Sequence, residues 1–482
     1  ENASSNDACD APASNASDDD SRKKQKTSRS REVVIDAMSR MPSRSRASDL
    51  HRIEVDFGEV VQPFWIGAAS ATEPTLLAGV LYAHRHFGKL DFGEVVAPAI
   101  REAREGIRLS AFTAHTFHLL DAILRSTPGS QETFMKKVGD EYESLKEGDL
   151  FRNERFAEFL ELLVANPDPE LLRPEYEAAG IIYEPWPIEE LEPLTTKIGV
   201  HRVCTVPPPY PGGLLMQHSL LQMDLDKVVN GTTLEQWEEI ATALLETQEA
   251  RTKFVDGAVL DGSVVTKLLA KDSHLGGTTH LSAIDREGNA VSVTITNGEG
   301  SGVVLSKYGI MTNNFLGEKD LHPTGFGKHS AGTRLPSMMC PTLARHRDGT
   351  WAALGSGGSE RIRSVVSQVV ARMLGGRSVH EAVCAPRLHW DGTQLHIECP
   401  LEDLIEDAVP SVVSKQEQER AALRWRDLLT AIRRRLGDSV PVNPWYRRAM
   451  YFGGVHVAYQ CSGDLRGLTS GQADPRRAGT SA

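Results

Sequence analysis

Apolar and polar residues alternate in two neighbouring runs near the middle of the chain. The first run opens at Thr278, and the second follows the sequence Asp-Arg-Glu-Gly-Asn at 285–289. The alternating apolar positions are Leu281, Ala283, Val291, Val293 and Ile295. A period of two on both sides of a segment rich in turn-forming residues predicts two strands joined by a turn.

Helical periodicity governs much of the remaining chain. The pattern over 77–162 is mostly helical, and a clearer helix begins at Thr233, which forms a capping box with Gln236. The apolar stripe of that helix consists of Trp237, Ile240 and Leu244. Three consecutive prolines at 207–209 favour a rigid extended loop before it. Strands and glycine turns are expected over 278–354.

The composition is typical of a soluble globular protein with a sizeable core. Hydrophobic residues make up 40% of the 482 residues and charged residues 24%. The net charge of −12 argues against nucleic acid as a partner. No apolar run approaches the length that spans a bilayer, so no membrane partner is expected. The first residues are polar and acidic, and the lack of a visible apolar leader favours a cytoplasmic location.

Two segments differ from the rest in composition. Residues 1–48 are rich in Ser, Asp, Asn, Lys and Arg, and we expect this polar tail to be disordered. A charged helical stretch is expected at 402–438. The six cysteines include no CxxC or CxH pair, so the sequence shows no disulfide framework and no zinc signature. No metal and no cofactor are expected.

Thr278 is the first candidate for chemistry. It follows Gly277 and stands at the head of the first alternating run. A threonine hydroxyl is a poor nucleophile unless a base lies beside it, and a threonine at a chain's own N-terminus carries that base as its α-amine. The chain would have to cleave itself before Thr278 to create such a terminus.

A glycine-rich turn is the second candidate. The sequence Gly-Ser-Gly-Gly-Ser at 355–359 lies between an expected strand, which includes Trp351 and Leu354, and an expected helix that Gly375 and Gly376 end. The apolar face of that helix consists of Ile362, Val365, Val366, Val369, Val370 and Met373. Backbone N–H groups at such a corner bind a phosphate, a carboxylate or a developing oxyanion. The turn lacks the Lys-Ser/Thr of a P-loop, so a nucleotide site is disfavoured.

Two polar loops complete the set of candidates. The segment 333–342 contains small hydroxyl residues and prolines and is suited to form a pocket wall. In the segment 309–318, Asn313 and Asn314 are expected to satisfy buried backbone groups, and Glu318 is suited to face a ligand amine. His280, two residues after Thr278, is expected to be a structural hydrogen-bonding residue.

Taken together and in order, these segments closely resemble the γ-glutamyltranspeptidase family. The matching motifs are Pro-Pro-Pro-x-x-Gly-Gly at 207–213, Thr-Thr-His at 278–280, Asp-x-x-Gly-Asn-Ala-Val at 285–291, Gly-Ile-x-x-Asn-Asn at 309–314, Ser-Met-x-x-Pro-Thr at 337–342 and Gly-Ser-Gly-Gly-Ser-x-Arg-Ile at 355–362. The resemblance implies an α+β fold, the four-layer αββα sandwich of N-terminal nucleophile hydrolases. It also implies self-cleavage into a large-subunit-like region, 49–277, and a small-subunit-like region, 278–482, which stay associated.

The resemblance also assigns roles to individual residues. Thr278 matches the nucleophile, and Thr296 matches the threonine that contacts it. Gly358 and Ser359 match the two positions whose N–H groups form the oxyanion hole, although the second is usually Gly. Glu318 matches the acidic residue that binds the α-amino group of the substrate.

The expected carboxylate-binding residues depart from the family pattern. Ser337 matches one of two serines that hold the α-carboxylate of the donor, and Met338 replaces the second. Gly58 stands where the family has an arginine that pairs with the same carboxylate. Asn297 belongs to a variant loop after Thr296 and is expected to join the substrate-binding residues.

The sequence therefore predicts a self-processing γ-glutamyl hydrolase or transpeptidase that forms an acyl-enzyme on Thr278. Its expected partners are a small γ-glutamyl substrate, such as glutathione, and an acceptor that is water, an amino acid or a peptide. Two alternatives remain open because of the departures at Gly58 and Met338. One is an acylase of the same fold that acts on a glutaryl or cephalosporin-type side chain. The other is an inactive family member that acts as a binding protein.

Overall fold

The computed structural model describes most of the chain. It covers residues 31–43, 49–56, 61–251, 277–322, 326, 328–345, 350–400, 415–437, 439–461 and 468–481. The predictions for 1–30, for Gly58 and for 402–414 lie outside the described residues.

The expected polar tail is wrong for residues 31–43. Strand β1 (Val34–Asp36) pairs antiparallel with β8 (Glu189–Leu191). The Asp36 carboxylate is buried and accepts hydrogen bonds from the Tyr210 hydroxyl and from Arg334 Nε, both at 2.6 Å. The pairing of β1 with β8 and the hydrogen bonds of Asp36 thus fix the position of this segment, although its overall composition is that of a solvated tail.

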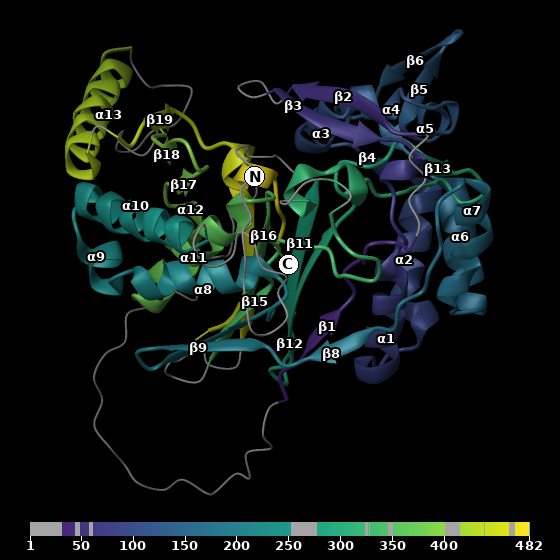
Figure 1. The fold of residues 1–482 in the computed structure, drawn as a ribbon, viewed down its shortest axis with the longest axis horizontal. Helices are drawn as coiled ribbons and strands as arrows, with labels where there is room; N and C mark the ends of the chain where they lie inside the picture. Colours follow the sequence, from purple (N-terminus) through teal and green to yellow (C-terminus); the bar gives the residue numbers. More distant parts are fainter. Residues whose placement is uncertain are drawn as a thin grey trace, which may run out of the picture.

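A six-stranded antiparallel sheet lies at the centre of the fold (Figure 1). Its spatial order is β21 (Thr469–Gln472), β20 (Gly454–Gln460), β16 (Trp351–Gly357), β15 (Thr342–Arg345), β10 (His201–Thr205) and β9 (Leu194–Ile198). The sheet combines strands from both sides of Thr278 in the sequence. The two regions that self-cleavage would separate therefore share one set of backbone hydrogen bonds.

The predicted strand pair is confirmed. Strands β11 (Thr278–Ile284) and β12 (Ala290–Thr296) form an antiparallel hairpin with Thr278 opposite Thr296. Asp285 fixes the connecting turn, because its carboxylate accepts from the backbone and side-chain N–H groups of Asn289. The hairpin packs against β16 and β20 of the central sheet, so the two sheets form adjacent layers.

Helices cover the outer faces of both sheets. On the side of the central sheet lie α8 (Pro211–Gln222), α9 (Leu225–Asn230), α10 (Thr233–Ala250), α11 (Arg361–Leu374) and α12 (Val379–Cys384). On the other side lie α1 (Thr75–Phe87), α2 (Phe92–Glu105), α6 (Glu154–Ala165) and α7 (Arg173–Ala178). The order of layers is α, β, β, α, which confirms the predicted αββα sandwich.

Shorter elements surround these layers. Before the hairpin they are β2 (His51–Asp56), β3 (Val61–Ile66), β4 (Ile107–Arg108), α3 (Ala111–Leu119), α4 (Asp121–Leu124), α5 (Pro128–Phe134), β5 (Met135–Val138), β6 (Glu141–Ser144) and β7 (Leu150–Phe151). After it they are β13 (Val304–Leu305), β14 (Ile310–Met311), β17 (Leu388–Trp390), β18 (Leu395–Glu398), α13 (Lys415–Leu436) and β19 (Val442–Trp445). Across the described ranges, no helix is both long enough and apolar enough to cross a membrane.

The cap of α10 lies one residue before the predicted one. The side chain of Thr232, not Thr233, accepts from the backbone N–H of Glu235, and the Glu235 carboxylate accepts from the N–H of Thr232. Both threonines fit the pattern, but only Thr232 has the extended backbone that a capping residue needs.

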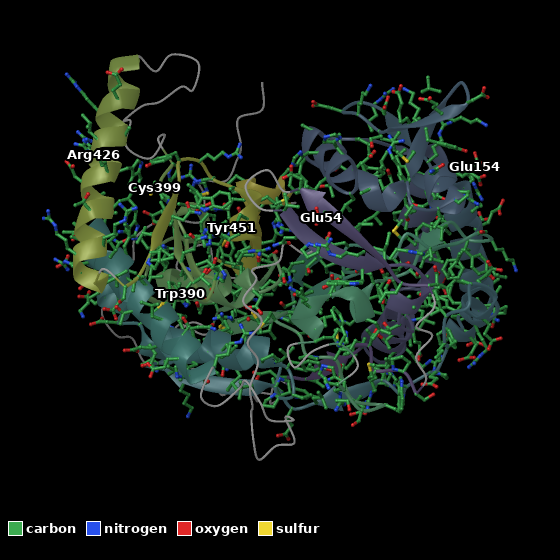
Figure 2. All side chains as sticks on the ribbon, turned by 45° about the horizontal axis from the view of Figure 1, so that its top comes forward. Glu54, Glu154, Trp390, Cys399, Arg426 and Tyr451 are labelled. Atoms are coloured by element: carbon green, nitrogen blue, oxygen red, sulfur yellow. The ribbon has the colours of Figure 1, made fainter. Side chains whose placement is uncertain are left out.

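Helix α11 is more deeply buried than its predicted apolar face suggests. All of its residues are buried, because the central sheet covers one side and α8, α12 and β17 cover the others. Two of its polar residues have internal partners: Arg363 donates to Gln248 at 3.0 Å, and the Ser364 hydroxyl lies 3.0 Å from His389 Nδ1. Figure 2 shows the contrast with α13, where Arg426 points outward from the molecule. The N-terminal end of α11 is consequently a rigid support for the glycine turn before it.

Candidate active site

The hairpin brings Thr278 and Thr296 together. They are directly opposite each other in the strand register, and the Thr278 hydroxyl donates to Thr296 Oγ1 at 3.3 Å. Thr278 is buried, so its hydroxyl is held among protein groups rather than in bulk water. The contact expected between the candidate nucleophile and a second threonine is present in this structure.

The loop after β12 packs against Glu318. Thr296 Oγ1 accepts from the backbone N–H of Gly298 at 3.0 Å, which fixes the start of the loop. Gly298 has a φ of +63°, and a side-chain carbon at this position would overlap Glu318 Oε1 and Asn314 Oδ1. Glycine is thus required here, and its absent side chain leaves room for the Glu318 carboxylate beside Gly298, two residues after Thr296.

The two asparagines of the segment 309–318 satisfy buried backbone groups, as predicted. Asn313 Oδ1 accepts from the backbone N–H groups of Thr72 and Phe315, at 3.0 and 3.2 Å. Asn314 Oδ1 accepts from the N–H of Glu299 at 2.9 Å. Both side chains are buried; Asn314 connects the loop that carries Glu318 to the loop after β12, and Asn313 connects it to Thr72.

The remaining predicted substrate-binding residues hold neighbouring loops. Asn297 is exposed, and its amide nitrogen donates to the carbonyls of Met311 and Thr312 at 3.2 and 3.3 Å. The buried hydroxyl of Ser337 accepts from the N–H of Met339 at 3.1 Å.

The loop that carries Ser337 packs on the first turn of α8. The Ser337 carbonyl accepts from the N–H of Gly212, and a side chain on Gly212 would overlap the backbone of Met338. The structure thus places Ser337 and Met338 against the glycine end of the proline-rich motif, and a role in binding substrate stays a prediction.

The glycine-rich corner lies directly against Thr278. A side-chain carbon on Gly357, the last residue of β16, would overlap the Thr278 carbonyl oxygen. The carbonyl oxygens of Gly358 and Ser359 accept from Arg361 and Ile362 at the start of α11. Because a trans peptide directs its N–H away from its C=O, the N–H of Ser359 points away from the helix. Ser359 has a φ of +51°, a backbone conformation that is uncommon for a residue with a side chain.

Arg477 is a site residue that the sequence did not reveal. It belongs to the 3₁₀ turn η10 (Pro475–Arg477) near the C-terminal end, and its Nη1 donates to the Thr278 carbonyl at 3.3 Å. Burial lowers the pKa of Arg477 to about 10, and the nearby charge of Arg361 contributes in the same direction. The guanidinium is still protonated at neutral pH, so a positive charge lies beside the candidate nucleophile.

Glu299 is a second site residue that sequence reasoning missed. It is buried, and its Oε2 would be 3.4 Å from a side-chain carbon on Gly277, the residue before Thr278. Its negative charge opposes the lowering of the Arg477 pKa. Arg477 and Glu299 therefore flank the bond between Gly277 and Thr278 with charges of opposite sign.

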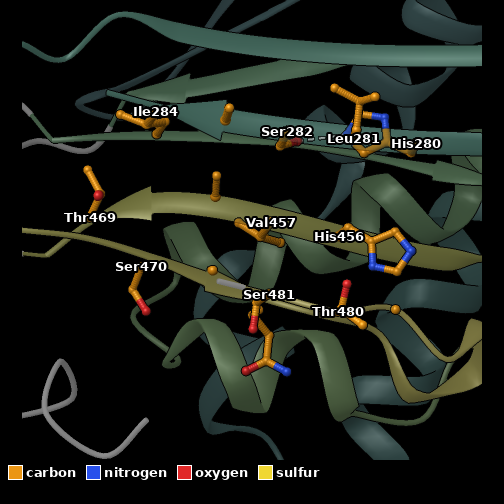
Figure 3. A pocket seen from close by; sticks show the side chains of 15 residues that line it. His280, Leu281, Ser282, Ile284, His456, Val457, Thr469, Ser470, Thr480 and Ser481 are labelled. Atoms are coloured by element: carbon orange, nitrogen blue, oxygen red, sulfur yellow. Dashed lines mark hydrogen bonds between the residues drawn. The ribbon is translucent and has the colours of Figure 1, made fainter. Parts of the chain in front are cut away.

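His280 has the predicted structural role. Its Nδ1 lies 2.8 Å from Thr294 Oγ1 and its Nε2 lies 2.8 Å from Ser282 Oγ, so strand neighbours occupy both ring nitrogens. Burial, with a smaller contribution from His456, lowers the pKa of His280 to about 3. His280 and His456 line a cavity of about 460 Å³ between β11 and β20 (Figure 3). A neutral, doubly hydrogen-bonded imidazole is suited to supporting the strand rather than to proton transfer.

Within the described ranges, no three His, Cys, Asp or Glu side chains converge as a metal ion would require.

The fold and this geometry define a class of protein. A four-layer αββα sandwich with a threonine at the head of an inner strand is the arrangement of N-terminal nucleophile hydrolases. The chain belongs to the gamma-glutamyltranspeptidase family: the model of that family matches residues 24–173 and 235–482. It is thus a hydrolase or transferase of the N-terminal nucleophile type.

Individual relatives include both hydrolases and acylases. The chain is 26% identical over 388 residues to the glutathione hydrolase proenzyme of Escherichia coli (strain K12), covering 68% of this chain and 66% of the relative. It is 27% identical over 425 residues to the acylase ACY 1 proenzyme of Pseudomonas sp. (strain V22), covering 79% and 75%. Among solved structures, the cephalosporin acylase from Bacillus halodurans superposes with a TM-score of 0.68 at 19% identity, covering 93% of this chain and 84% of that one. At this identity the superposition shows the fold alone.

Proposed function

We propose that this chain is a self-processing amidase that cleaves itself before Thr278 and then hydrolyses or transfers a γ-glutamyl group. The observation that carries the proposal is the pairing of the Thr278 and Thr296 hydroxyls at 3.3 Å, with the glycine corner against the Thr278 carbonyl. A nucleophile, a residue that orients it and an oxyanion-binding corner are the parts that acyl transfer requires.

Self-cleavage would use the same hydroxyl as catalysis. Thr278 Oγ attacks the carbonyl carbon of Gly277, and an ester forms between the two residues. The amide nitrogen of Thr278 leaves with the hydroxyl proton and becomes an amine. Water then hydrolyses this ester. The products are fragments of 277 and 205 residues, and the second begins with a free α-amine on Thr278.

Catalysis would follow from that new terminus. The α-amine accepts the hydroxyl proton as Thr278 Oγ attacks the γ-carbonyl of the donor. The N–H groups of Gly358 and Ser359 stabilise the oxyanion, and the leaving amine takes the proton. Water or an acceptor amine then releases the acyl group. Removing one donor of an oxyanion hole lowers such rates by roughly 10² to 10³.

The substrate side of the site favours a donor with an α-amino group. The Glu318 carboxylate lies against Gly298, whose N–H donates to Thr296, and a carboxylate at this place can pair with an ammonium group. Glutathione-like γ-glutamyl amides carry this ammonium group.

A second candidate is an acylase for glutaryl-type side chains, which lack the α-amine. It is favoured by Met338, which stands where the family has a serine for the α-carboxylate, and by the likeness to acylase proenzymes.

Incubation of the purified chain tests self-cleavage. We expect fragments of 277 and 205 residues, with N-terminal sequencing of the smaller one starting at Thr-Thr-His, and Thr278→Ala should remain one band. An intact, folded wild-type chain without activity would instead support an inactive binding protein.

A pair of anilides separates the two enzymatic candidates. We expect faster release of aniline from the γ-glutamyl compound than from the glutaryl compound, and Glu318→Gln should weaken only the former. Preference for the glutaryl anilide, unaffected by Glu318→Gln, would make the acylase the correct assignment.

A further inference from the structure

The side chain of Arg477 lies in a channel that glycines leave open. A side-chain carbon on Gly454 would lie 2.7 to 2.9 Å from the aliphatic part of Arg477, closer than such carbons approach. One on Gly357 would lie 3.0 Å from Nη1, and one on Gly358 would lie 3.7 Å from Nη2. Three glycines on two strands and a turn therefore accommodate this one arginine against the nucleophile.

A buried network of charges fixes the turn that carries Arg477. Asp474 accepts from Arg387 Nη2 at 2.5 Å, from Arg476 Nη1 at 3.3 Å and from the N–H of Val455 at 2.7 Å. Arg476 in turn pairs with Glu398 at 2.6 Å, and all four charged side chains are fully buried. Since neighbouring Asp474 and Arg476 are immobilised in this way, the position of Arg477 is defined as well.

Arg477 itself has few protein partners for a buried cation. Its Nη1 donates to the Thr278 carbonyl at 3.3 Å, and its Nε is buried without a hydrogen-bond partner among the described residues. Burying a cation with so few hydrogen bonds is unfavourable. The atom it contacts belongs to the residue whose amine would become the general base.

We propose that Arg477 is an electrostatic positioning residue, which holds the Thr278 carbonyl and keeps the newly formed α-amine unprotonated and able to act as a base. This inference rests on the proposed function and goes beyond it, because it assigns the control of the base to a residue at the far end of the chain. The α-nitrogen of Thr278 lies within about 7 Å of Nη1, since only three covalent bonds separate it from the carbonyl oxygen.

Other charges around the amine must be included. The charged or titratable groups near Thr278 and Arg477 are Glu299 after β12, Arg361 of α11, Asp474 before η10, His280 of β11 and His456 of β20. Glu318, after η5 (Phe315–Gly317), lies against Gly298. Burial lowers the pKa of both histidines, which are neutral near pH 7. Among the acids, Glu299 lies next to Gly277. Its negative charge raises the pKa of the amine, whereas the positive charge of Arg477 lowers it.

The expected effect follows from Coulomb's law. A positive charge about 7 Å from the amine disfavours its protonated form. At an effective dielectric constant of 20, this lowers the pKa of the amine by roughly one to two units. The amine is active when unprotonated, so activity rises with pH through its pKa. Arg477→Met should therefore move the acidic limb of the pH profile up by about one unit, and Glu299→Gln should move it down by a similar amount.

The experiment measures kcat/KM against pH for the self-cleaved enzyme, with whichever anilide it hydrolyses. Arg477→Lys, which keeps the charge, should retain the wild-type limb even where its maximal rate falls. Arg426→Met is the matched control, because Arg426 is exposed on α13. The pKa of the Thr278 amine is measured independently of substrate from the pH dependence of its acetylation by acetic anhydride, followed by mass spectrometry.

Each outcome decides a separate point. The proposal is overturned if the midpoint of the acidic limb is the same, within about 0.3 pH unit, in wild type and Arg477→Met. It is also overturned if Arg477→Lys moves this midpoint as far as Arg477→Met does. If Arg477→Met does not cleave itself, a specific protease site placed before Thr278 supplies the free amine, and the same comparison is made. A wild-type chain that never exposes Thr278 would refute the proposed function instead.

Discussion

The hydroxyl of Thr296 offers a direct test of how the nucleophile is held. It accepts one hydrogen bond from Thr278 at 3.3 Å and one from the N–H of Gly298 at 3.0 Å. Thr296→Val removes both bonds and keeps the shape of the side chain. The first loss frees the nucleophile to rotate, and the second leaves a buried N–H without its partner.

The size of the effect can be estimated from these two bonds. A buried donor without a partner costs about 1–3 kcal/mol, and a typical hydrogen bond contributes about 1 kcal/mol. The bond to Thr278 is long for two hydroxyls, so its share in the uncleaved chain is at the lower end of that range. The bond tightens as the oxygen attacks, so its loss raises the barrier by about 1–3 kcal/mol, and self-cleavage slows roughly 5- to 150-fold.

A gel time course of self-cleavage, combined with thermal melting, tests the estimate. Thr296→Ser keeps the hydroxyl and is the matched control, which should cleave within a few-fold of wild type. We expect Thr296→Val to melt at a lower temperature and to cleave far more slowly. If it folds and cleaves within twofold of wild type, Thr296 merely packs beside the nucleophile, and the orientation argument is wrong.

Three further variants probe the glycines and the buried histidine. Gly357→Ala should slow self-cleavage at least 10-fold on the same gels, because its side chain would displace the Thr278 carbonyl; a wild-type rate would show that the corner adapts. Gly298→Ala should raise KM for the γ-glutamyl anilide by displacing Glu318. Gly139 has the same φ of +63° but open space around it, so the control variant Gly139→Ala should leave KM unchanged. His280→Asn should make the free energy of unfolding less sensitive to acid. The pKa of His280 is about 3 in the folded protein and about 6.5 in the unfolded chain. Between about pH 6.5 and pH 4, protonation of the unfolded chain therefore lowers the free energy of unfolding by about 1.4 kcal/mol per pH unit. Urea unfolding at pH 4, 5 and 6 measures that slope, and an unchanged slope in the variant contradicts the assignment.

The parts of the site that depend on local patterns could be predicted from the sequence. Alternation around the turn at 285–289 correctly gave the hairpin that places Thr278 opposite Thr296. Asn313 and Asn314 were correctly expected to satisfy backbone groups, because short polar side chains in a loop serve that purpose well. In each case the decisive partners lie within one hairpin or one loop, or are backbone groups that any sequence supplies.

Long-range contacts explain what sequence reasoning missed. Arg477 is 199 positions away from Thr278, and no local pattern marks it as different from the arginine before it. Residues 34–36 were assigned to a polar tail because composition averages over many residues, whereas three residues suffice for a strand when β8 offers its edge. Glu299 resembles a solvated loop residue until the loop is seen folded onto Gly277.

The position of Arg477 also links the stability of the small-subunit-like region to its proposed chemistry. Burial would raise the pKa of Asp474, but Arg387 and Arg476 hold it below its usual value, so the network remains charged at neutral pH. Breaking one member of a buried ion pair leaves an uncompensated charge and costs about 3–5 kcal/mol. Such a loss would release the turn at 475–477 from the sheet and withdraw a cation from the amine. A substitution in this network, although far from the substrate, would then first change the pH dependence of activity, before the fold itself is lost.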